Sequence, residues 1–349
     1  MKDNKNVVGI RVDANAVLGL GHLMRCMAFA YAMQEQELEC IFYTAEEAAG
    51  KLLEEKGFCS KILYTDYTRM EAELPGLKKM LEDDGCGLVL VDSYQITQKY
   101  LNELMECCPV YYMDDTGEDR LQANGIVDYN IYGPNLGYEK WCGPETDLLL
   151  GVEYAPVKKA FLETPYMVRD RVSKIMITMG GSDALNIAGR LSQRLLQCLA
   201  EDVGIDIICG RFNPHLDALK TLEEQNPRIH IMVDVPDMWN KMAAADLVVS
   251  AAGSTMYELS AMGVPTVCCY YVENQRRIAE AFASGVGMLN AGDFAADSES
   301  VLEILCMEIN RLVNDTSARK VLSERMMQIV DGRGPQRLAK KLCQRLLTK

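Results

Sequence analysis

The chain has 349 residues, of which 49% are hydrophobic and 25% are charged, and its formal net charge is -14. This length favours two α/β domains over one, and the composition is that of a globular protein rather than a disordered one. The negative charge argues against nucleic acid as a partner, although backbone N–H groups at helix N-termini can still bind a small anion such as a nucleotide diphosphate.

The first residues, from Met1 to Asn6, precede only a short apolar run, and no apolar stretch approaches the length needed to span a membrane. We therefore expect a cytoplasmic protein with neither a signal peptide nor a membrane span. The 13 cysteines include no C-x-x-C pair. We interpret them as reduced thiols, since their spacing does not match a disulfide framework or a set of zinc ligands.

Short β-branched runs alternate with longer amphipathic segments in the first half of the chain, which predicts βα units that form a parallel sheet. The predicted strands are Val7–Val12, Cys40–Tyr43, Lys61–Tyr64, Leu88–Val91 and Val110–Met113, and the predicted helices include Leu23–Met33 and Tyr100–Cys107. We assign residues 1–160 to an N-terminal Rossmann-like domain.

An irregular segment from Gly151 to Arg171 predicts a linker, after which a second strand–helix series begins. Its predicted strands are Lys174–Met179, Ile205–Cys209, His230–Val233, Leu247–Ser250 and Thr266–Tyr271. We assign residues 171–334 to a second Rossmann-like domain and residues 335–349 to a C-terminal helix that packs back on the first. Two such α/β domains facing across a cleft form the GT-B architecture of many glycosyltransferases. Their ligands bind at the carboxyl ends of the strands.

A glycine-rich turn, Gly19-Leu20-Gly21-His22, opens the first predicted helix. Its spacing is similar to a dinucleotide fingerprint, but Met24 replaces the third glycine and the second strand has no acidic residue at its end, which disfavours NAD or FAD. The positive end of the helix dipole disfavours the charged imidazolium, so the neutral ring of His22 is suited to accept a proton. Simple capping of the helix by His22 is the alternative.

Further polar residues follow two other strands of the same predicted sheet. Tyr94 comes after Leu88–Val91, and Asp114 and Asp115 come after Val110–Met113. Because parallel strands end at one edge, we expect these side chains to lie near His22. A solvated acidic turn is the alternative for the two aspartates.

Two loops of the second half are candidate phosphate cradles. Gly180-Gly181-Ser182-Asp183 precedes a helix predicted from about Ala184, and Gly253-Ser254-Thr255 precedes another, with Glu258 one turn in. Glycines allow backbone donors to approach a pyrophosphate, and Glu258 could accept both ribose hydroxyls. Ordinary turns and N-caps are the alternative. The complete predicted nucleotide-binding set is Gly180, Gly181, Ser182, Val235, Met238, Gly253, Ser254, Thr255 and Glu258.

The sequence lacks a D-x-D motif, a G-x-x-x-x-G-K-[ST] loop and an H-E-x-x-H motif. Sugar transfer that depends on a metal and chemistry that depends on ATP are therefore disfavoured. We expect neither a metal nor a cofactor.

Motifs along nearly the whole chain resemble the UDP-sugar hydrolases of pseudaminic acid biosynthesis (the PseG type), a family related to spore-coat polysaccharide proteins. The histidine-containing turn is the most specific of them, since the C-terminal motifs are similar to those of lipid-linked peptidoglycan glycosyltransferases. The matching stretches are Arg11-Val12-Asp13, Gly19-Leu20-Gly21-His22, Arg25-Cys26, Val91-Asp92-Ser93-Tyr94, Met113-Asp114-Asp115, Leu149-Leu150-Gly151, Gly180-Gly181-Ser182-Asp183, Ala252-Gly253-Ser254-Thr255, Gly263-Val264-Pro265, Glu273-Asn274-Gln275 and Asp331-Gly332-Arg333-Gly334.

The resemblance implies hydrolysis of UDP-2,4-diacetamido-2,4,6-trideoxy-β-L-altropyranose, with His22 as the catalytic residue that activates water. The reaction would release UDP and the free sugar with inversion. The residues predicted to bind the sugar are Asp13, Gly21, Arg25, Tyr94, Asp115, Asn274 and Gln275. Two alternatives stay open, a UDP-sugar glycosyltransferase with an unidentified acceptor and a non-catalytic nucleotide-sugar sensor.

Overall fold

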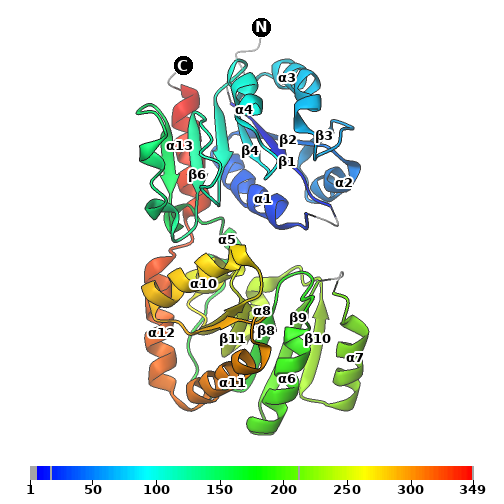
Figure 1. Cartoon of the computed structure of the whole chain (residues 1–349), viewed down its shortest axis with the longest axis vertical. Helices are drawn as coiled ribbons and strands as arrows, with labels where there is room; N and C mark the ends of the chain where they lie inside the picture. Colours follow the sequence, from blue (N-terminus) through cyan, green and yellow to red (C-terminus); the bar gives the residue numbers. More distant parts are fainter. Residues whose placement is uncertain (1–5, 16–17, 211–212, 348–349) are drawn as a thin grey trace. The chain divides into compact units, whose positions relative to one another are not determined.

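The computed structural model describes residues 6–15, 18–210 and 213–347, and the chain divides into two compact units (Figure 1). The N-terminal unit comprises residues 1–157 and 333–349, and the C-terminal unit comprises residues 158–332. The first boundary therefore falls inside the segment predicted as a linker. The C-terminal segment belongs to the N-terminal unit.

The N-terminal unit is built on a seven-stranded parallel sheet in the order β3-β2-β1-β4-β5-β6-β7. Its strands are β1 Val7–Val12, β2 Glu39–Thr44, β3 Cys59–Ile62, β4 Cys86–Asp92, β5 Val110–Met113, β6 Gly125–Asp128 and β7 Asp147–Leu150. The sequence predicted the first five of these strands. It missed β6 and β7, because no α-helix separates β5, β6 and β7 and the strand–helix alternation is lost there.

Helices follow the strands of this unit: α1 Gly21–Gln34, α2 Glu47–Glu55, α3 Leu74–Asp83, α4 Gln98–Met105 and α13 Gly334–Leu347, with short 3₁₀ turns η1 Met70–Glu73, η2 Gly133–Asn135, η3 Tyr138–Lys140 and η4 Val152–Tyr154. Helix α13 packs along α1 (Figure 1). Its buried Leu338, Leu342 and Leu346 recur every four residues, as an amphipathic helix requires. At Gly334 a Cβ atom would lie 2.2 Å from the carbonyl oxygen of Ala155, so only glycine fits.

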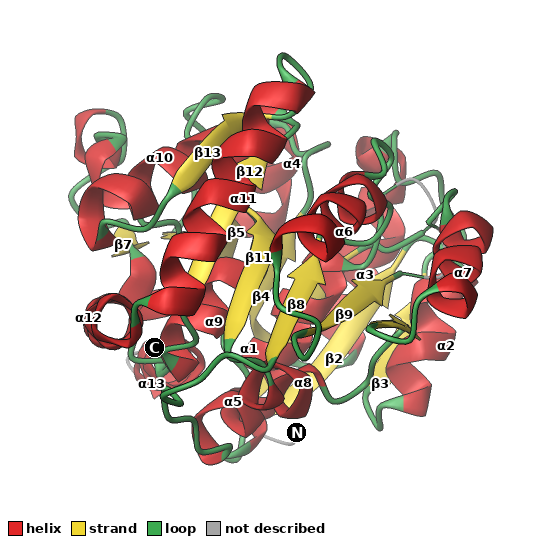
Figure 2. Cartoon of the chain, turned by 90° about the horizontal axis from the view of Figure 1, so that it is seen from below, coloured by secondary structure: helices red, strands yellow, loops and turns green. Residues whose placement is uncertain are grey.

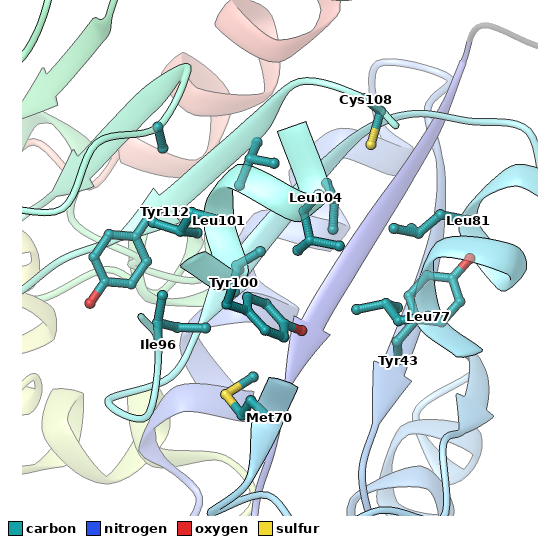
Figure 3. Packing of buried hydrophobic residues seen from close by; sticks show 14 of the residues in the cluster. Tyr43, Met70, Leu77, Leu81, Ile96, Tyr100, Leu101, Leu104, Cys108 and Tyr112 are labelled. Atoms are coloured by element: carbon teal, nitrogen blue, oxygen red, sulfur yellow. The ribbon is translucent and has the colours of Figure 1, made fainter. Parts of the chain in front are cut away.

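The core of the N-terminal unit includes a cluster in which α3 and α4 pack on the sheet. Leu77 and Leu81 from α3 and Leu101 and Leu104 from α4 are buried here, as Figure 3 shows. Tyr43 from β2 also belongs to the cluster.

The C-terminal unit repeats the design with six parallel strands in the order β10-β9-β8-β11-β12-β13. The strands are β8 Lys174–Thr178, β9 Gly204–Cys209, β10 Ile229–Val233, β11 Leu247–Ala251, β12 Thr266–Tyr270 and β13 Asn290–Asp293. The helices are α5 Lys159–Glu163, α6 Ile187–Cys198, α7 Leu216–Gln225, α8 Met238–Ala244, α9 Thr255–Met262, α10 Glu273–Val286, α11 Ser298–Asn314 and α12 Thr316–Ile329. Helices α6 and α11 pack against each other over this sheet (Figure 2).

In both sheets the strand order reverses beside the first strand, between β1 and β4 and between β8 and β11. Neighbouring loops diverge at such a switch point, which is where open α/β sheets bind ligands. Within the described residues, no helix combines the length and the apolar character needed to cross a membrane.

Candidate functional site

Asp92, the last residue of β4, is the centre of a hydrogen-bonded cluster at the switch point of the first sheet. Its Oδ1 lies 2.6 Å from His22 Nδ1, and it receives the Arg25 guanidinium through Nε to Oδ2 at 2.6 Å and Nη2 to Oδ1 at 2.5 Å. His22 and Arg25 are three residues apart on α1, so they lie on one side of the helix. The first turn of α1 therefore presents both groups to one carboxylate.

The charge on Asp92 determines which nitrogen of His22 carries hydrogen. Burial alone would raise the Asp92 pKa, but Arg25 and then His22 stabilise the anion, so the pKa lies well below its usual range. An ionised carboxylate can only accept hydrogen bonds, so Nδ1 must donate to it. Arg25 Nη2 lies 3.0 Å from His22 Nδ1 because both nitrogens donate to the same oxygen, Oδ1 of Asp92. The Nε2 lone pair remains available for a proton.

Tyr94 and Asp115 form the more exposed side of the same cluster. The Tyr94 hydroxyl donates to Asp115 Oδ2 at 2.9 Å, and Arg25 Nη1 donates to the same oxygen at 2.7 Å. The rings of His22 and Tyr94 pack edge to face, with their centroids 4.7 Å apart. Burial and the nearby Asp115 raise the pKa of Tyr94, so its hydroxyl stays protonated. The structure thus brings together the predicted residues His22, Arg25, Tyr94 and Asp115.

Arg25 is the least accessible of these residues, with 7% of its surface exposed. Besides Asp92 and Asp115, its Nη1 donates to the hydroxyl of Tyr129 at 3.1 Å. Four of its five N–H groups would thus be used within the protein. This geometry leaves little of the guanidinium for a sugar.

Asp13 belongs to a separate buried network. Its Oδ2 receives Arg11 Nη1 at 2.6 Å and its Oδ1 receives the Ala45 N–H at 2.7 Å. Arg11 also binds Glu73 through two N–H groups, at 2.6 and 2.8 Å. The carboxylate that contacts His22 is Asp92, which the sequence interpretation did not select. Its signal was its place at the end of a central strand, two residues before Tyr94.

Gly21 is the first residue of α1, beside His22. An added Cβ there would meet no described atom within 4 Å. The start of α1 is therefore open on this side.

In the C-terminal unit, the loop Gly180–Ser182 follows β8 at the second switch point. The helix after it begins at Ile187, not near Ala184 as predicted, because Asn186, directly before it, adopts a positive φ of 52° outside the helical conformation. The Asp183 carboxylate accepts the Ile187 N–H at 2.8 Å and the Ala188 N–H at 2.9 Å. These first donors of α6 are therefore occupied, so at this switch point only the backbone of the loop Gly180–Ser182 itself could bind a phosphate.

The loop after β11 is different. Helix α9 begins at Thr255 after Ser254, and neither Ser254 nor Thr255 donates its backbone N–H to any group within the described part of the chain. Glu258, one turn later, is half-buried, and its carboxylate makes no hydrogen bond to another described residue. Burial, opposed by Lys158, raises the pKa of Glu258 to about 7. This loop can therefore bind an anion and accept hydroxyl donors.

The other predicted nucleotide and sugar residues follow β10 and β12, at the same edge of the second sheet. Val235 and Met238 are half-buried, and Asn274 is exposed at the start of α10. Gln275 accepts the Tyr271 N–H through Oε1 at 3.2 Å. Across the described residues of both units, no group of three or more His, Cys, Asp or Glu side chains is arranged to hold a metal ion.

Residues 174–328 match the model of the glycosyltransferase family 28 C-terminal domain. An uncharacterised protein of Methanocaldococcus jannaschii is 26% identical over 77% of this chain, and that alignment covers 56% of the archaeal protein. The spore coat polysaccharide biosynthesis protein SpsG of Bacillus subtilis is 24% identical over 94% of this chain and 95% of its own length. The UDP-2,4-diacetamido-2,4,6-trideoxy-beta-L-altropyranose hydrolase of Campylobacter jejuni is 21% identical over 77% of this chain and 93% of its own. The chain is therefore a distant homologue of these proteins.

Solved structures share the fold over nearly the whole chain. MurG of Acinetobacter baumannii has a TM-score of 0.64 at 14% identity, covering 97% of this chain and 99% of that one. The UDP-GlcNAc 2-epimerase of Neisseria meningitidis bound to UDP-GlcNAc has a TM-score of 0.65 at 13% identity, covering 98% and 100%. The fold is therefore that of the GT-B glycosyltransferases, with two parallel-sheet α/β domains, as the sequence predicted.

Proposed function

We propose that this protein hydrolyses a UDP-linked amino sugar at its anomeric carbon, with His22 as the base that activates water. The observation that carries the proposal is the contact between His22 Nδ1 and the ionised Asp92. This contact directs the hydrogen of His22 to Nδ1 and leaves Nε2 as the proton acceptor. Nε2 itself makes no hydrogen bond to another described residue. A general base of this type accelerates reactions by about 10²- to 10⁴-fold.

The step would proceed as a single displacement. The water oxygen bonds to the anomeric carbon, His22 Nε2 takes the water proton, and the bond to the UDP oxygen breaks with its electron pair. The configuration inverts. UDP is a good leaving group, and backbone donors at the start of α9 can stabilise its charge. One base is therefore sufficient where ordinary glycosidases need two carboxyl groups.

We assign nucleotide binding to the C-terminal unit. Ser254 and Thr255 would bind the pyrophosphate through their backbone N–H groups, together with the loop Gly180–Ser182 and Gly253. Glu258 would accept the ribose hydroxyls, and Val235 and Met238 would contact the base. Asn274 and Gln275 would contact the sugar or its phosphate, and in the N-terminal unit Gly21, Tyr94 and Asp115 would surround the sugar. Asp13, whose two carboxylate oxygens are already bonded to Arg11 and to the Ala45 N–H, would support this region from the buried side.

The distant homology to a UDP-sugar hydrolase and to a spore coat polysaccharide protein supports this assignment. It also points to UDP-2,4-diacetamido-2,4,6-trideoxy-β-L-altropyranose, or a close analogue, as the substrate. The free sugar would then serve nonulosonic acid or surface polysaccharide biosynthesis.

A UDP-sugar glycosyltransferase is the second candidate, favoured by the family 28 match in the C-terminal unit. In that reaction His22 would take a proton from an acceptor hydroxyl instead of water. The same nucleotide contacts would be used, so the two candidates differ only in the nucleophile.

The deciding experiment is UDP release from a panel of UDP-amino-sugars, without metal and without acceptor, for the wild type and His22→Ala. We expect release by the wild type on at least one diacetamido sugar and nearly none by the variant. UDP binding without release would favour a transferase lacking its acceptor, or a sensor. Equal release by both proteins would exclude His22 as the base.

A further inference from the structure

Two buried arginines of the N-terminal unit bind carboxylates in the same way. Arg11 holds Glu73 through Nε and Nη2 and Asp13 through Nη1. Arg25 holds Asp92 through Nε and Nη2 and Asp115 through Nη1. Only the second arrangement includes a histidine. The difference suggests that Arg25 has a task beyond stability.

The hydrogen-bonding capacity of Asp92 is fully used. Oδ1 accepts from Arg25 Nη2 and His22 Nδ1, and Oδ2 accepts from Arg25 Nε and from Cys26 Sγ at 3.4 Å. A carboxylate has about four acceptor sites, so none remains for water or a ligand. Asp92 can therefore influence chemistry only through His22.

Arg25 fixes the plane of this carboxylate. Rotation of an aspartate about its last bond is soft, but two parallel N–H bonds from one planar guanidinium hold it. The third contact, from Nη1 to Asp115, holds the guanidinium itself. The one remaining acceptor site of Oδ1 is then aimed at Nδ1, 2.6 Å away. That contact requires a hydrogen between the two atoms, because two lone pairs would repel each other at this distance.

We infer that Arg25 is a positioning residue that orients Asp92 so that His22 is held with hydrogen on Nδ1 and a lone pair on Nε2. It therefore acts on the reaction through Asp92 and His22, and does not bind the sugar. This inference rests on the proposed function of His22 as the base. It also assigns Asp92 as a second positioning residue.

The direct test is the nitrogen NMR spectrum of histidine-labelled full-length protein at alkaline pH. The chain has only three histidines, His22, His215 and His230, and His22→Gln identifies the His22 signals by their loss. We expect a single Nδ1–H form in the wild type. Asp92→Asn should move hydrogen to Nε2, and Arg25→Gln should give a mixture of both forms. Arg25→Lys, which keeps the charge, should restore part of the Nδ1–H form.

Kinetics give an independent test. We expect kcat to fall about 10³-fold in Asp92→Asn and about 10²-fold in Arg25→Gln, with KM changed by less than about fivefold, since a wrong tautomer in a related dyad costs about 10⁴. If Arg25 acts through Asp92, the double variant should be no slower than Asp92→Asn alone. Losses that multiply would overturn the inference, and so would an unchanged Nδ1–H form in Arg25→Gln, whatever the form in Asp92→Asn.

Arg11→Gln is the matched control, because it breaks a similar buried network without touching Asp92. It should lower stability while the Nδ1–H form of His22 persists. If Arg25→Gln does not fold, Arg25→Lys, which keeps the buried charge but not the planar guanidinium, gives the NMR comparison, and a complete Nδ1–H form in it would overturn the inference. The spectra do not depend on turnover. A protein with the expected tautomers but no UDP release would therefore refute the proposed function alone.

Discussion

The two switch points have the same topology and opposite chemistry. At β1 and β4, charged side chains are buried and bonded to one another, with Asp92 and Arg25 at the centre. At β8 and β11, glycine-rich loops leave the backbone N–H of Ser254 without an acceptor among the described residues, and the Glu258 carboxylate makes no hydrogen bond to a described residue. At the first switch point the side chains are held in place before a ligand binds. At the second, hydrogen-bond donors and acceptors remain free to bind the ligand. Orientation in advance favours catalysis, whereas unused donors favour binding.

The largest expected effect comes from His22→Gln. If the first switch point performs the chemistry, kcat should fall by about 10²- to 10⁴-fold while UDP affinity changes by less than about twofold. His215→Gln is the matched control, since this histidine lies in the C-terminal unit and its Nε2 contacts the Ala184 carbonyl. Steady-state kinetics and UDP titration calorimetry measure both quantities. Loss of UDP affinity in His22→Gln would contradict the division between the two switch points.

The second prediction concerns the stability of the N-terminal unit. Arg11→Met leaves Glu73 and Asp13 buried without their cation, which should lower the free energy of unfolding by about 3–5 kcal/mol. Both Arg11 and the Glu73 side chain have no exposed surface, so solvent cannot compensate. Urea unfolding followed by far-UV circular dichroism measures the change in the free energy of unfolding. A double variant with Glu73→Leu should recover part of the loss, and a loss below about 1 kcal/mol would show that the network contributes little.

The architecture was predictable from the sequence because short apolar runs that alternate with amphipathic segments indicate buried parallel strands. Ten predicted strands correspond to β1–β5 and β8–β12. Strand β3 ends at Ile62 rather than Tyr64, since Tyr64 adopts a positive φ of 55° that leaves the strand conformation. The short strands β6, β7 and β13 lack a long apolar run, and only their pairing with neighbouring strands defines them.

The site was predictable in part. Strand ends located His22, Tyr94 and Asp115, because the topology of a parallel sheet gathers them. Which carboxylate contacts His22 depends on side-chain geometry, and no spacing rule separates Asp92 from Asp13. The cap formed by Asp183 was equally hidden, since it depends on a residue with a positive φ.

The third prediction uses Glu258 to test the binding character of the second switch point. Glu258→Gln should weaken UDP binding about tenfold, because a charged acceptor for the ribose hydroxyls is lost. Glu280→Gln, on the exposed face of α10, is the control. Turnover at saturating substrate should stay within about threefold of the wild type. An unchanged UDP dissociation constant would remove Glu258 from the nucleotide site.

The same variant should have a distinct effect on stability. The pKa of Glu258 is raised to about 7 from an ordinary 4.5, so the folded state favours the protonated form. The stability this provides is complete below about pH 4.5 and is lost as the pH rises through 7, by up to about 3 kcal/mol. Glu258→Gln without ligand should therefore be more stable than the wild type at about pH 8 and not at about pH 4.5. Denaturant titrations at both values measure this, and equal stability at pH 8 would show that the buried charge costs nothing.

The smallest expected effect is that of Tyr94→Phe. The phenyl ring keeps the edge-to-face contact with His22, and only the hydroxyl bond to Asp115 is lost. Because Arg25 still binds the same Asp115 oxygen, we expect kcat/KM to fall by only about three- to tenfold, the equivalent of one hydrogen bond. Tyr94→Ala removes the ring as well and should cost more, through a less ordered His22. If Tyr94→Phe were as slow as His22→Gln, the hydroxyl itself would take part in the chemistry, and the first switch point would contain a second reacting group.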